Sequence, residues 1–433
     1  MERNPSSSPC IIPSTDCSGG DGTVSNALDV LRERSFVKDV SDEAGLRAAM
    51  ERPITFYIGF DPTAPSFHVG NLLPIMAMAW MQRFGHRPIA ITGGGTALVG
   101  DPTGKAVSRP ILTHEQIEQN LRGQKAQLQH YIDFDEGRAL MVNNADWLTK
   151  LNYVEFLRDI GVHFSVNHML ATETYRTKLE SESGLSFLEF NYALLQAYDF
   201  LHLYREYGCV MQAGGSDQWA NSLAGADLIR KIEGGQAYVL TFPLLTTASG
   251  AKMGKTEAGA VWLDPNLVSP YEFYQYWINT EDLDVERFLA LYTFLPLEEV
   301  RELGRLRGAD LRRAKEILAF EATRITHGEE ASREARATSR ALFGGGEGAM
   351  DGVPASEISN AELEQGVPAS QLFASTGLAS SRGEARRLIQ QGGAYVNGQR
   401  VEGVDQLITP GDLSDGSLLL RAGKKKYHRI TVS

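Results

Sequence analysis

Strand-like apolar runs alternate with helical stretches through the middle of this sequence, from residue 54 to about residue 263. The clearest runs of strand length are 55–60, 88–92, 139–143 and 209–213, and the stretch 72–83 has the pattern of a helix. This alternation predicts an α/β fold whose mostly parallel sheet carries helices on both faces. In such a sheet the ligand crevice lies outside the carboxyl ends of the strands.

Polar, glycine-rich segments lie beside these runs, so their loops can converge at one edge of the sheet. They are 59–64, 93–95, 100–105 and 214–219. The glycines do not form a dinucleotide-binding fingerprint, because Leu98 stands where the third glycine is required. The segment 100–106 is one residue too short for a P-loop and ends in Ala106. A dehydrogenase and a P-loop kinase are therefore both disfavoured.

Two short motifs frame this region. H-V-G-N at 68–71 follows the first strand and opens the helix 72–83, where the positive end of a helix favours a phosphate. K-M-G-K-T at 252–256 places two lysines three residues apart in a segment too rich in glycine for a rigid helix. Such a loop can close over a polyphosphate. Either motif alone is weak, because a helix cap or a solvated turn would also explain it.

With its context, this pair of motifs resembles the bacterial tyrosyl-tRNA synthetases, which are class I aminoacyl-tRNA synthetases. The resemblance covers residues 26–433. The pair of motifs indicates the class of synthetase. Two further segments, Y-x-G-F-D-P-T at 57–63 and Q-A-Y-D-F at 196–200, indicate that the amino acid is tyrosine. Asn71 departs from the more usual second histidine, and Gly254 and Thr256 stand where serine is commoner across the class. We expect these departures to alter affinity without abolishing function.

Composition excludes a membrane span and fits a reducing cytoplasm, and the charge does not exclude a nucleic-acid partner. Of the 433 residues 42% are hydrophobic, and no apolar run reaches the roughly 18 residues that a membrane span needs. The three cysteines, Cys10, Cys17 and Cys209, suggest neither a disulfide framework nor a zinc site, so no metal site is expected. The net charge is −12, but the chain from Leu378 onward carries +4. Local charge governs phosphate binding, so a nucleic-acid partner remains open.

The chain is long enough for two or three domains. In chain order we expect a disordered extension (1–25), a Rossmann-like parallel-sheet catalytic domain (26–268), an α-helical anticodon-arm-binding domain (269–343), a linker (344–370) and a small α+β S-four-like RNA-binding domain (371–433). The extension has little arginine, so a transit peptide is disfavoured. Amphipathic helices are expected at about 27–34 and 42–50.

The last domain combines a capped basic helix with a hairpin that has an Asn-Gly turn at Asn397. This pattern resembles the S-four-like RNA-binding module, and the basic tail adds to the same positive patch. A stray helix-hairpin with ordinary surface arginines is the weaker alternative. The residues expected to contact RNA are Arg382, Arg386, Arg387, Lys424, Lys425 and Lys426.

The resemblance implies ATP-dependent activation of an amino acid, in which a carboxylate attacks the α-phosphate and expels pyrophosphate. Such a reaction needs cations and N–H donors around the phosphates more than it needs a nucleophile. Mg²⁺ would enter with ATP as its substrate complex, and no tightly bound cofactor is expected. The residues that the resemblance assigns to catalysis are Thr63, His68, Lys105, Arg109, Lys252, Lys255 and Thr256.

Tyrosine selection requires a hydrogen-bonding partner for a phenol hydroxyl at the bottom of an apolar pocket. By resemblance, Tyr57 and Asp199 face that hydroxyl; core aromatics are the alternative for the tyrosines alone, whereas a carboxylate beside Phe200 is costly unless paired. The expected tyrosine-binding residues are Tyr57, Asp101, Tyr192, Gln196, Asp199, Gln212 and Gln218. The expected ATP-binding residues are Gly59, Asp61, His68, Gly70, Asn71, Gly215, Asp217 and Lys255.

The expected partners are L-tyrosine, ATP and tRNA(Tyr), with a homodimer as the assembly and no membrane. Two other functions stay open. A tryptophanyl-type relative would share the two motifs, although an indole has no hydroxyl for Tyr57 and Asp199. A non-catalytic RNA-binding protein would keep the fold without turnover.

Overall fold

The computed structural model of the chain describes residues 26–101, 113–182, 184–250, 253–256, 259–344, 353–414, 416–423 and 426–433. The extension expected at 1–25 lies outside the described residues. Two compact units are present. The first runs to Lys255 and also includes Val261–Asp264 and Thr280–Leu318; the second comprises Thr256–Ala260, Pro265–Asn279 and Ala319–Ser433.

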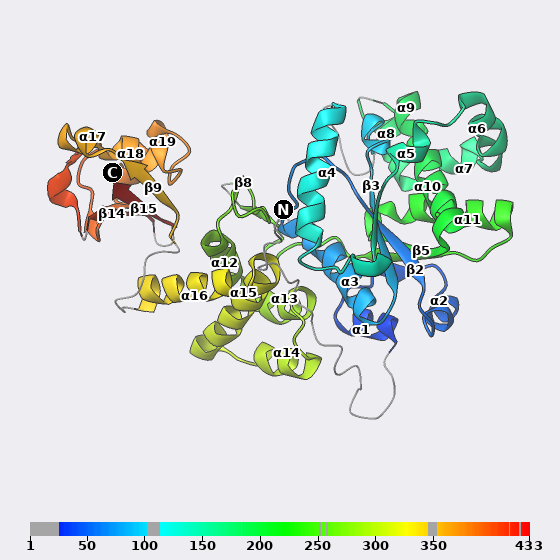
Figure 1. Ribbon diagram of the computed structural model, residues 1–433, viewed down its shortest axis with the longest axis horizontal. Coiled ribbons are helices and arrows are strands. Elements are labelled where there is room, and N and C mark those ends of the chain that lie inside the picture. The colour runs from blue at the N-terminus through cyan, green and yellow to red at the C-terminus, as the bar shows by residue number, and fades with distance from the viewer. Residues whose placement is uncertain are drawn as a thin grey trace, which may run out of the picture. The chain divides into compact units, whose positions relative to one another are not determined.

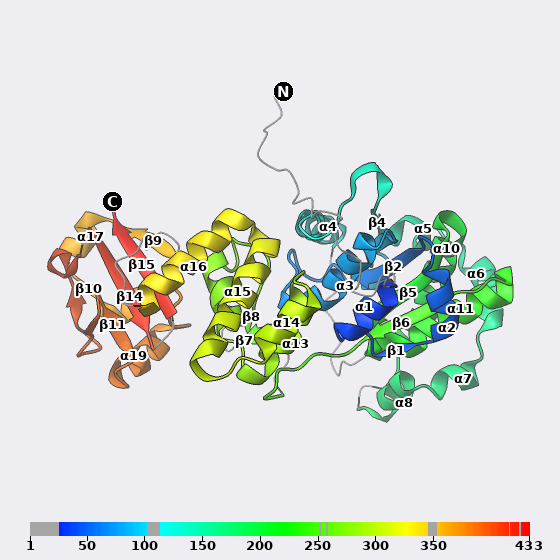
Figure 2. The same cartoon turned by 90° about the horizontal axis from the view of Figure 1, so that it is seen from below.

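A six-stranded sheet forms the centre of the first unit, in the order β1-β6-β5-β2-β3-β4. Its strands are β1 (Asp39–Val40), β2 (Thr55–Phe60), β3 (Arg87–Thr92), β4 (Leu140–Asn143), β5 (Cys209–Gly215) and β6 (Tyr238–Phe242). All neighbours pair in parallel except β1, which runs antiparallel to β6. Figure 2 shows the strands from below. The four expected strands are confirmed, whereas β1 and β6 were not expected.

Helices cover both faces of this sheet. Figure 1 shows α3 (Leu72–Arg83) on one side and α10 (Tyr192–Tyr207) with α11 (Trp219–Glu233) on the other. The expected helix 72–83 is confirmed, and nine of its residues are buried. Helix α10 ends where Gly208 adopts φ +62°, a conformation that favours glycine. The expected N-terminal helices are present as α1 (Ala27–Glu33) and α2 (Glu43–Ala49).

Further helices of the first unit follow the strands or flank the sheet. They are α4 (His114–Leu128), α5 (Ala145–Leu148), α6 (Tyr153–Asp159), α7 (Val166–Leu170), α8 (Glu173–Glu180), α9 (Phe187–Phe190), α13 (Val285–Tyr292) and α14 (Leu297–Gly304). Helix α15 (Leu311–His327) begins in this unit and ends in the second.

A buried arginine joins α1 to α13. Arg34, only 2% exposed, donates from Nη1 to the carbonyl of Ala290 at 2.9 Å and from Nη2 to the carbonyl of Leu295. Its guanidinium lies 3.9 Å from the centre of the Trp80 ring on α3. Burial lowers the pKa of Arg34 to about 10, so it is still charged near neutral pH. These carbonyls and the indole face compensate the cost of burying that charge.

The expected helical domain 269–343 does form helices, but it is divided between the two units. Helix α13 packs against α3 in the first unit, while α12 (Pro270–Ile278) packs against α16 (Glu329–Gly344) in the second. Helix α12 starts with a capping box between Ser269 and Glu272 and has proline at its first turn. The apolar faces of α12 and α13 thus pack against helices of different units.

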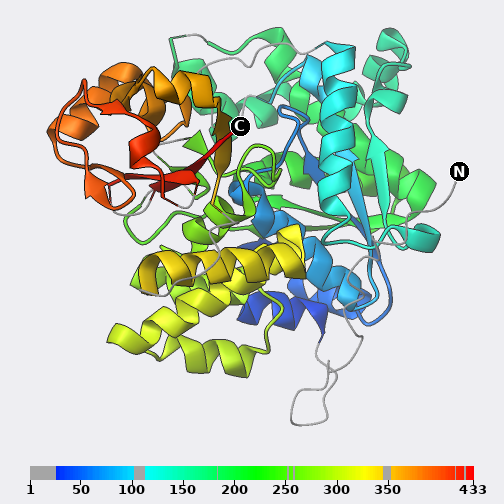
Figure 3. The ribbon, with the colours of Figure 1, turned by 60° about the vertical axis from the view of Figure 1, so that its left-hand side comes forward.

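A five-stranded sheet in the order β12-β11-β14-β15-β9 builds the C-terminal part of the second unit. Figures 1 and 3 show its helices gathered on one side of the strands. The expected capped helix is α19 (Arg382–Gln390), with Ser381 accepting the N–H of Glu384. The expected hairpin turn is confirmed at Asn397 and Gly398, which have φ +47° and +79°.

The elements of this part begin well before residue 371. They are β9 (Ala355–Ile358), α17 (Asn360–Glu364), β10 (Val367–Pro368), α18 (Ala369–Ser375), α19, β11 (Ala394–Val396), β12 (Gln399–Arg400), β13 (Leu407–Ile408), β14 (Ser417–Ala422) and β15 (Lys426–Val432).

The linker expected at 344–370 is therefore wrong from residue 353 onward. Ile358, Leu363 and Val367 are buried in the same core as Phe373 and Ile430. Strand β9 also pairs in parallel with β15, so this stretch is part of the folded domain. Among the described residues, no helix has the length and apolar character required to cross a membrane.

Candidate active site

A buried carboxylate lies on α10 beside the sheet. Asp199 is 4% exposed and accepts two hydrogen bonds, from Nδ2 of Asn144 at 2.9 Å and from Nε1 of Trp147 at 2.8 Å. Burial raises the pKa of Asp199 to about 7, and the two hydrogen bonds oppose that rise. The expectation that an acid here must be paired is confirmed.

Four other residues expected to bind tyrosine lie on β2, β5 and α10. Tyr57 on β2 and Gln212 on β5 are register partners on neighbouring strands, and both are buried. Gln196 and Tyr192 lie on α10, about one and two turns before Asp199 respectively. Burial, with Asp199 nearby, raises the pKa of the Tyr57 hydroxyl far above its usual value.

Three polar atoms in this group have no partner among the described residues. They are the Tyr57 hydroxyl, Oε1 of Gln196 and Oε1 of Gln212. Buried polar groups are normally satisfied, because an unpaired one costs about 1–3 kcal/mol. Three such atoms, on residues assigned to one ligand, fit a pocket that is completed by a polar substrate.

Asn144 and Trp147 were not expected from the sequence. Asn144 also accepts the N–H of Gly95 at 2.7 Å, so its amide joins the glycine-rich turn after β3 to Asp199. The Trp147 indole stacks on His202 with the ring centres 4.2 Å apart. Asn144 directly follows strand β4, so the rule that polar residues after parallel strands line the site would have found it.

A second polar group joins two more expected residues. Gln218 donates from Nε2 to Oδ2 of Asp101 at 2.9 Å, and accepts from Nδ2 of Asn221 at 3.3 Å. Gln218 lies just after β5, in the short helical turn Ser216–Gln218. The structure thus brings together Asp101 and Gln218, which are 117 residues apart.

The first motif forms the turn between β2 and α3. Asn71 accepts the backbone N–H of His68 on its Oδ1 at 3.1 Å, which closes the turn Val69–Asn71. The His68 ring lies 5.9 Å from the ring of Trp262. Asn71 stands where the family more usually has a second histidine. Its side chain nevertheless stabilises the turn, because its oxygen accepts a hydrogen bond at the cap.

The second motif approaches the first at two glycines. Gly254 has φ +78°, and a Cβ there would lie 2.6 Å from the backbone nitrogen of Gly70. A Cβ on Gly70 would in turn lie 3.3 Å from the carbonyl oxygen of Met253. The described parts of the two motifs are thus in contact, and serine at position 254 would not fit this arrangement.

The segment before the second motif is held by an acidic turn. Asp284, 2% exposed, accepts the N–H of Ala248 at 2.8 Å and pairs with Arg287 at 2.6 Å. Arg287 donates to the carbonyl of Thr246 at 2.7 Å. Lys105, Arg109 and Lys252 lie outside the described residues, and Lys255 and Thr256 are described only as the backbone of β7 (Lys255–Thr256).

The remaining residues expected at the nucleotide lie at the ends of β2 and β5. Gly59, Asp61 and Thr63 occupy the end of β2 and the loop after it. Gly215 ends β5 and Asp217 follows it, exposed. Because the two strands are parallel neighbours, these residues share one edge of the sheet.

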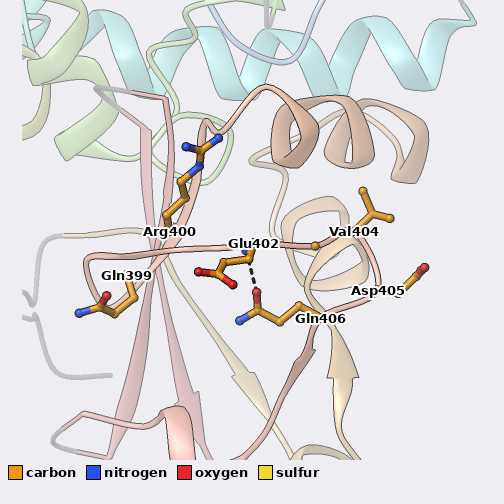
Figure 4. Close-up of a pocket in the computed structure, with 7 residues that line it drawn as sticks. Gln399, Arg400, Glu402, Val404, Asp405 and Gln406 are labelled. Atoms are coloured by element: carbon orange, nitrogen blue, oxygen red, sulfur yellow. Dashed lines mark hydrogen bonds between the residues drawn. The ribbon is translucent and has the colours of Figure 1, made fainter.

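The residues expected to bind RNA are exposed where they are described. Arg382, Arg386 and Arg387 lie on α19 and Lys426 begins β15, whereas Lys424 and Lys425 lie outside the described residues. Figure 4 shows a pocket lined by residues 399, 400 and 402–406. Arg386 reaches its rim through an ion pair with Asp405 at 3.5 Å.

Within the described ranges, no cluster of three or more His, Cys, Asp or Glu side chains could hold a metal ion.

Comparison with known families covers almost the whole chain. Residues 49–344 match the family described as tRNA synthetases class I (W and Y). Residues 347–430 match the family described as the tyrosine–tRNA ligase SYY-like C-terminal domain. The chain therefore belongs to the class I tRNA synthetases of the tryptophan and tyrosine group.

Individual relatives of the chain indicate one amino acid, whereas the family covers two. The chain is 56% identical over 428 residues to a tyrosine–tRNA ligase of Desulfosudis oleivorans, covering 94% of this chain and 99% of the relative. It is 55% identical over 408 residues to that of Caldanaerobacter subterraneus, with the same coverage. Among solved structures, a C-terminally truncated mitochondrial tyrosyl-tRNA synthetase of Aspergillus nidulans aligns with a TM-score of 0.67 at 32% identity, covering 75% of this chain and 96% of that one.

Proposed function

We infer that this aminoacyl-tRNA synthetase is a tyrosine–tRNA ligase and that the pocket around Asp199 selects its amino acid. The observation that carries the selectivity is the buried Asp199 carboxylate beside a Tyr57 hydroxyl that lacks a partner among the described residues. A phenol hydroxyl can donate to the carboxylate and accept from Tyr57. Phenylalanine would leave both groups unpaired, which is costly in a buried site.

The ammonium and carboxylate of tyrosine bind further along the pocket. The buried Oε1 of Gln196 accepts from the substrate ammonium group, with Tyr192 and Asp101 beside it. Gln212 and Gln218 complete the polar end of the pocket. This placement leaves the substrate carboxylate towards the carboxyl ends of β2 and β5, where the residues assigned to ATP lie.

ATP, as its Mg²⁺ complex, enters between the two motifs. The tyrosine carboxylate oxygen attacks the α-phosphorus, the bond to the bridging oxygen breaks, and pyrophosphate leaves with that electron pair. His68, Thr63, Lys252 and Lys255 stabilise the negative charge that develops on the phosphates. The tyrosyl group is then transferred to a hydroxyl of the terminal adenosine of tRNA(Tyr), and AMP is released.

Two adjoining roles belong to the same proposal. The exposed arginines of α19 and the basic residues 424–426 contact the tRNA backbone.

The working form is a cytoplasmic homodimer, and an apolar surface supports this assembly. Between residues 153 and 188, eight large apolar side chains are more than one third exposed, among them Phe187 at 68% and Val162 at 71%.

One assay tests the activity: exchange of labelled pyrophosphate into ATP with tyrosine, tryptophan or no amino acid. Tyrosine alone should drive exchange. Exchange driven by tryptophan would assign the chain to the tryptophanyl branch. If protein that has been shown to be folded catalyses no exchange with either amino acid, the chain is a non-catalytic RNA-binding protein. As a pocket control, Asp199→Ala should lose tyrosine-driven exchange by about 100-fold or more.

A further inference from the structure

Helix α4 lies along the loop that joins β2 to the first motif. Its amide side chains at positions 120, 124 and 127 follow the helical spacing i, i+4 and i+7, so they share one face. Asn120 and Gln124 are 8% and 1% exposed, which is unusual for such polar side chains. Burying amides is costly unless they are hydrogen-bonded, so their partners indicate what this face does.

Each of these amides binds the loop 61–67. Nδ2 of Asn120 donates to the carbonyl of Pro62 at 2.7 Å. Nε2 of Gln124 donates to the carbonyls of Asp61 and Ala64 at 3.2 and 3.3 Å. Asn120 and Gln124 therefore bind this loop through its backbone carbonyls.

Gln127 completes the contact at the far end of the loop. Its Oε1 accepts the N–H of Phe67 at 2.8 Å, and its Nε2 donates to Oγ of Ser66 at 2.9 Å. His68 follows directly in the chain. The contact thus extends from the end of β2 to the first residue of the motif.

Glycine at position 123 allows the helix to come this close. A Cβ on Gly123 would lie 2.1 Å from the carbonyl oxygen of Pro65 and 3.2 Å from its carbon. Thr63, in the middle of the loop, remains exposed. The helix therefore fixes the loop backbone and leaves the Thr63 side chain accessible.

We propose that α4 positions the nucleotide half of the active site: Asn120, Gln124 and Gln127 are positioning residues that set where Thr63 and His68 stand. This rests on the proposed function, in which those two residues act on the phosphates of ATP. The amides bind the loop after β2, whereas the tyrosine pocket is built from β2, β5 and α10. Their loss should therefore affect ATP far more than tyrosine.

The sharpest variant is Asn120→Asp, which keeps the shape of the side chain but turns its donor towards the Pro62 carbonyl into an acceptor. Gln119→Glu is the matched control, because it adds the same charge at the preceding residue, which is exposed. Gly123→Ala tests the close approach independently. Gln127→Glu, which can still accept from Phe67, should retain more activity than Gln127→Ala.

We expect Asn120→Asp to lower kcat/KM for ATP in tyrosine-dependent exchange by about tenfold or more, with the Kd for tyrosine within about twofold of wild type. Amide hydrogen exchange across 61–67 should accelerate in Asn120→Asp and stay unchanged in Gln119→Glu. Unaltered ATP kinetics, or an equal loss of tyrosine binding, would overturn the proposal. If the wild-type protein lacks exchange activity, the proposed function fails, while hydrogen exchange still tests the contact.

Discussion

Gly254 and Gly70 approach each other so closely that a Cβ on Gly254 would lie 2.6 Å from the Gly70 nitrogen. The positive φ of Gly254 adds a conformational cost of about 1 kcal/mol or more for any other residue. We expect Gly254→Ala to push the two motifs apart and to slow tyrosyl-adenylate formation at least about tenfold. Stopped-flow or exchange kinetics would measure this, with tyrosine affinity largely retained.

Gly250→Ala is the control for this substitution. Gly250 has a similar φ of +85° but has no atom within 4 Å of its would-be Cβ, so only the conformational cost applies. Equal losses in the two variants would mean that the contact with Gly70 is unimportant.

The Asp199 carboxyl should make tyrosine binding depend on pH. Its pKa is about 7, so the carboxylate that is proposed to accept the phenol hydroxyl predominates only above that pH. The Tyr57 hydroxyl does not titrate in this range, because its pKa is raised far above the usual value. We expect tyrosine affinity to increase between pH 6 and pH 8 and the increase to be absent in Asp199→Asn. Equilibrium dialysis would measure it.

The Asp199 carboxyl also makes folding stability depend on pH, but in the opposite direction: raising the pH lowers its contribution to the free energy of unfolding. Its pKa in the folded protein is higher than the ordinary value of 3.8, so folding favours the protonated form. The contribution to the free energy of unfolding is therefore fully present below about pH 4 and is lost as the pH rises to about 7.

Asp284 should matter to stability and to the second motif together. Asp284→Ala leaves the Ala248 N–H and Arg287 without their partner, which we expect to cost about 2–3 kcal/mol in the free energy of unfolding. Urea denaturation would measure this. Asp282→Ala is the matched control: Asp282 is 71% exposed, and losing its pair with Lys315 should cost less than about 1 kcal/mol. Similar costs would contradict the assignment.

The apolar surface at residues 153–188 should hold the dimer together. If the proposed homodimer forms through this surface, Phe187→Asp adds a charge to it, and sedimentation velocity should show a monomer at concentrations where the wild type associates. Leu283→Asp is the control, since Leu283 is 86% exposed but lies outside this surface. A Phe187→Asp protein that remains dimeric would place the interface elsewhere.

The sequence predicted the parts of the fold whose pattern is local. The strand 55–60 and the helix 72–83 are uninterrupted apolar stretches with clear ends, and both were predicted with correct bounds. The two-residue strand β1 was missed, because it is defined by its partner β6 and has no pattern of its own. The stretch 353–370 was taken for a linker, since its buried residues Ile358, Leu363 and Val367 are separated by polar ones.

For the site, the sequence motifs supplied the residues proposed to contact the substrates, but not the residues that hydrogen-bond to them. Asn144, Trp147 and Asn120 reach partners that are 48, 52 and 58 residues away in the sequence, and such contacts depend on tertiary packing. Neither asparagine lies in a recognisable motif. Trp147 and Asn120 become evident only in the fold, whereas Asn144 could have been found from its position directly after β4.

The contact between Arg34 and α13 determines how short a catalytic fragment can be. A chain cut at residue 268 would lack the carbonyls of Ala290 and Leu295, and the Arg34 charge would remain beside Trp80 without them. Such a fragment should expose the apolar side of α3 and aggregate. A fragment that keeps this contact must therefore extend beyond Leu295, far past the last strand of the six-stranded sheet.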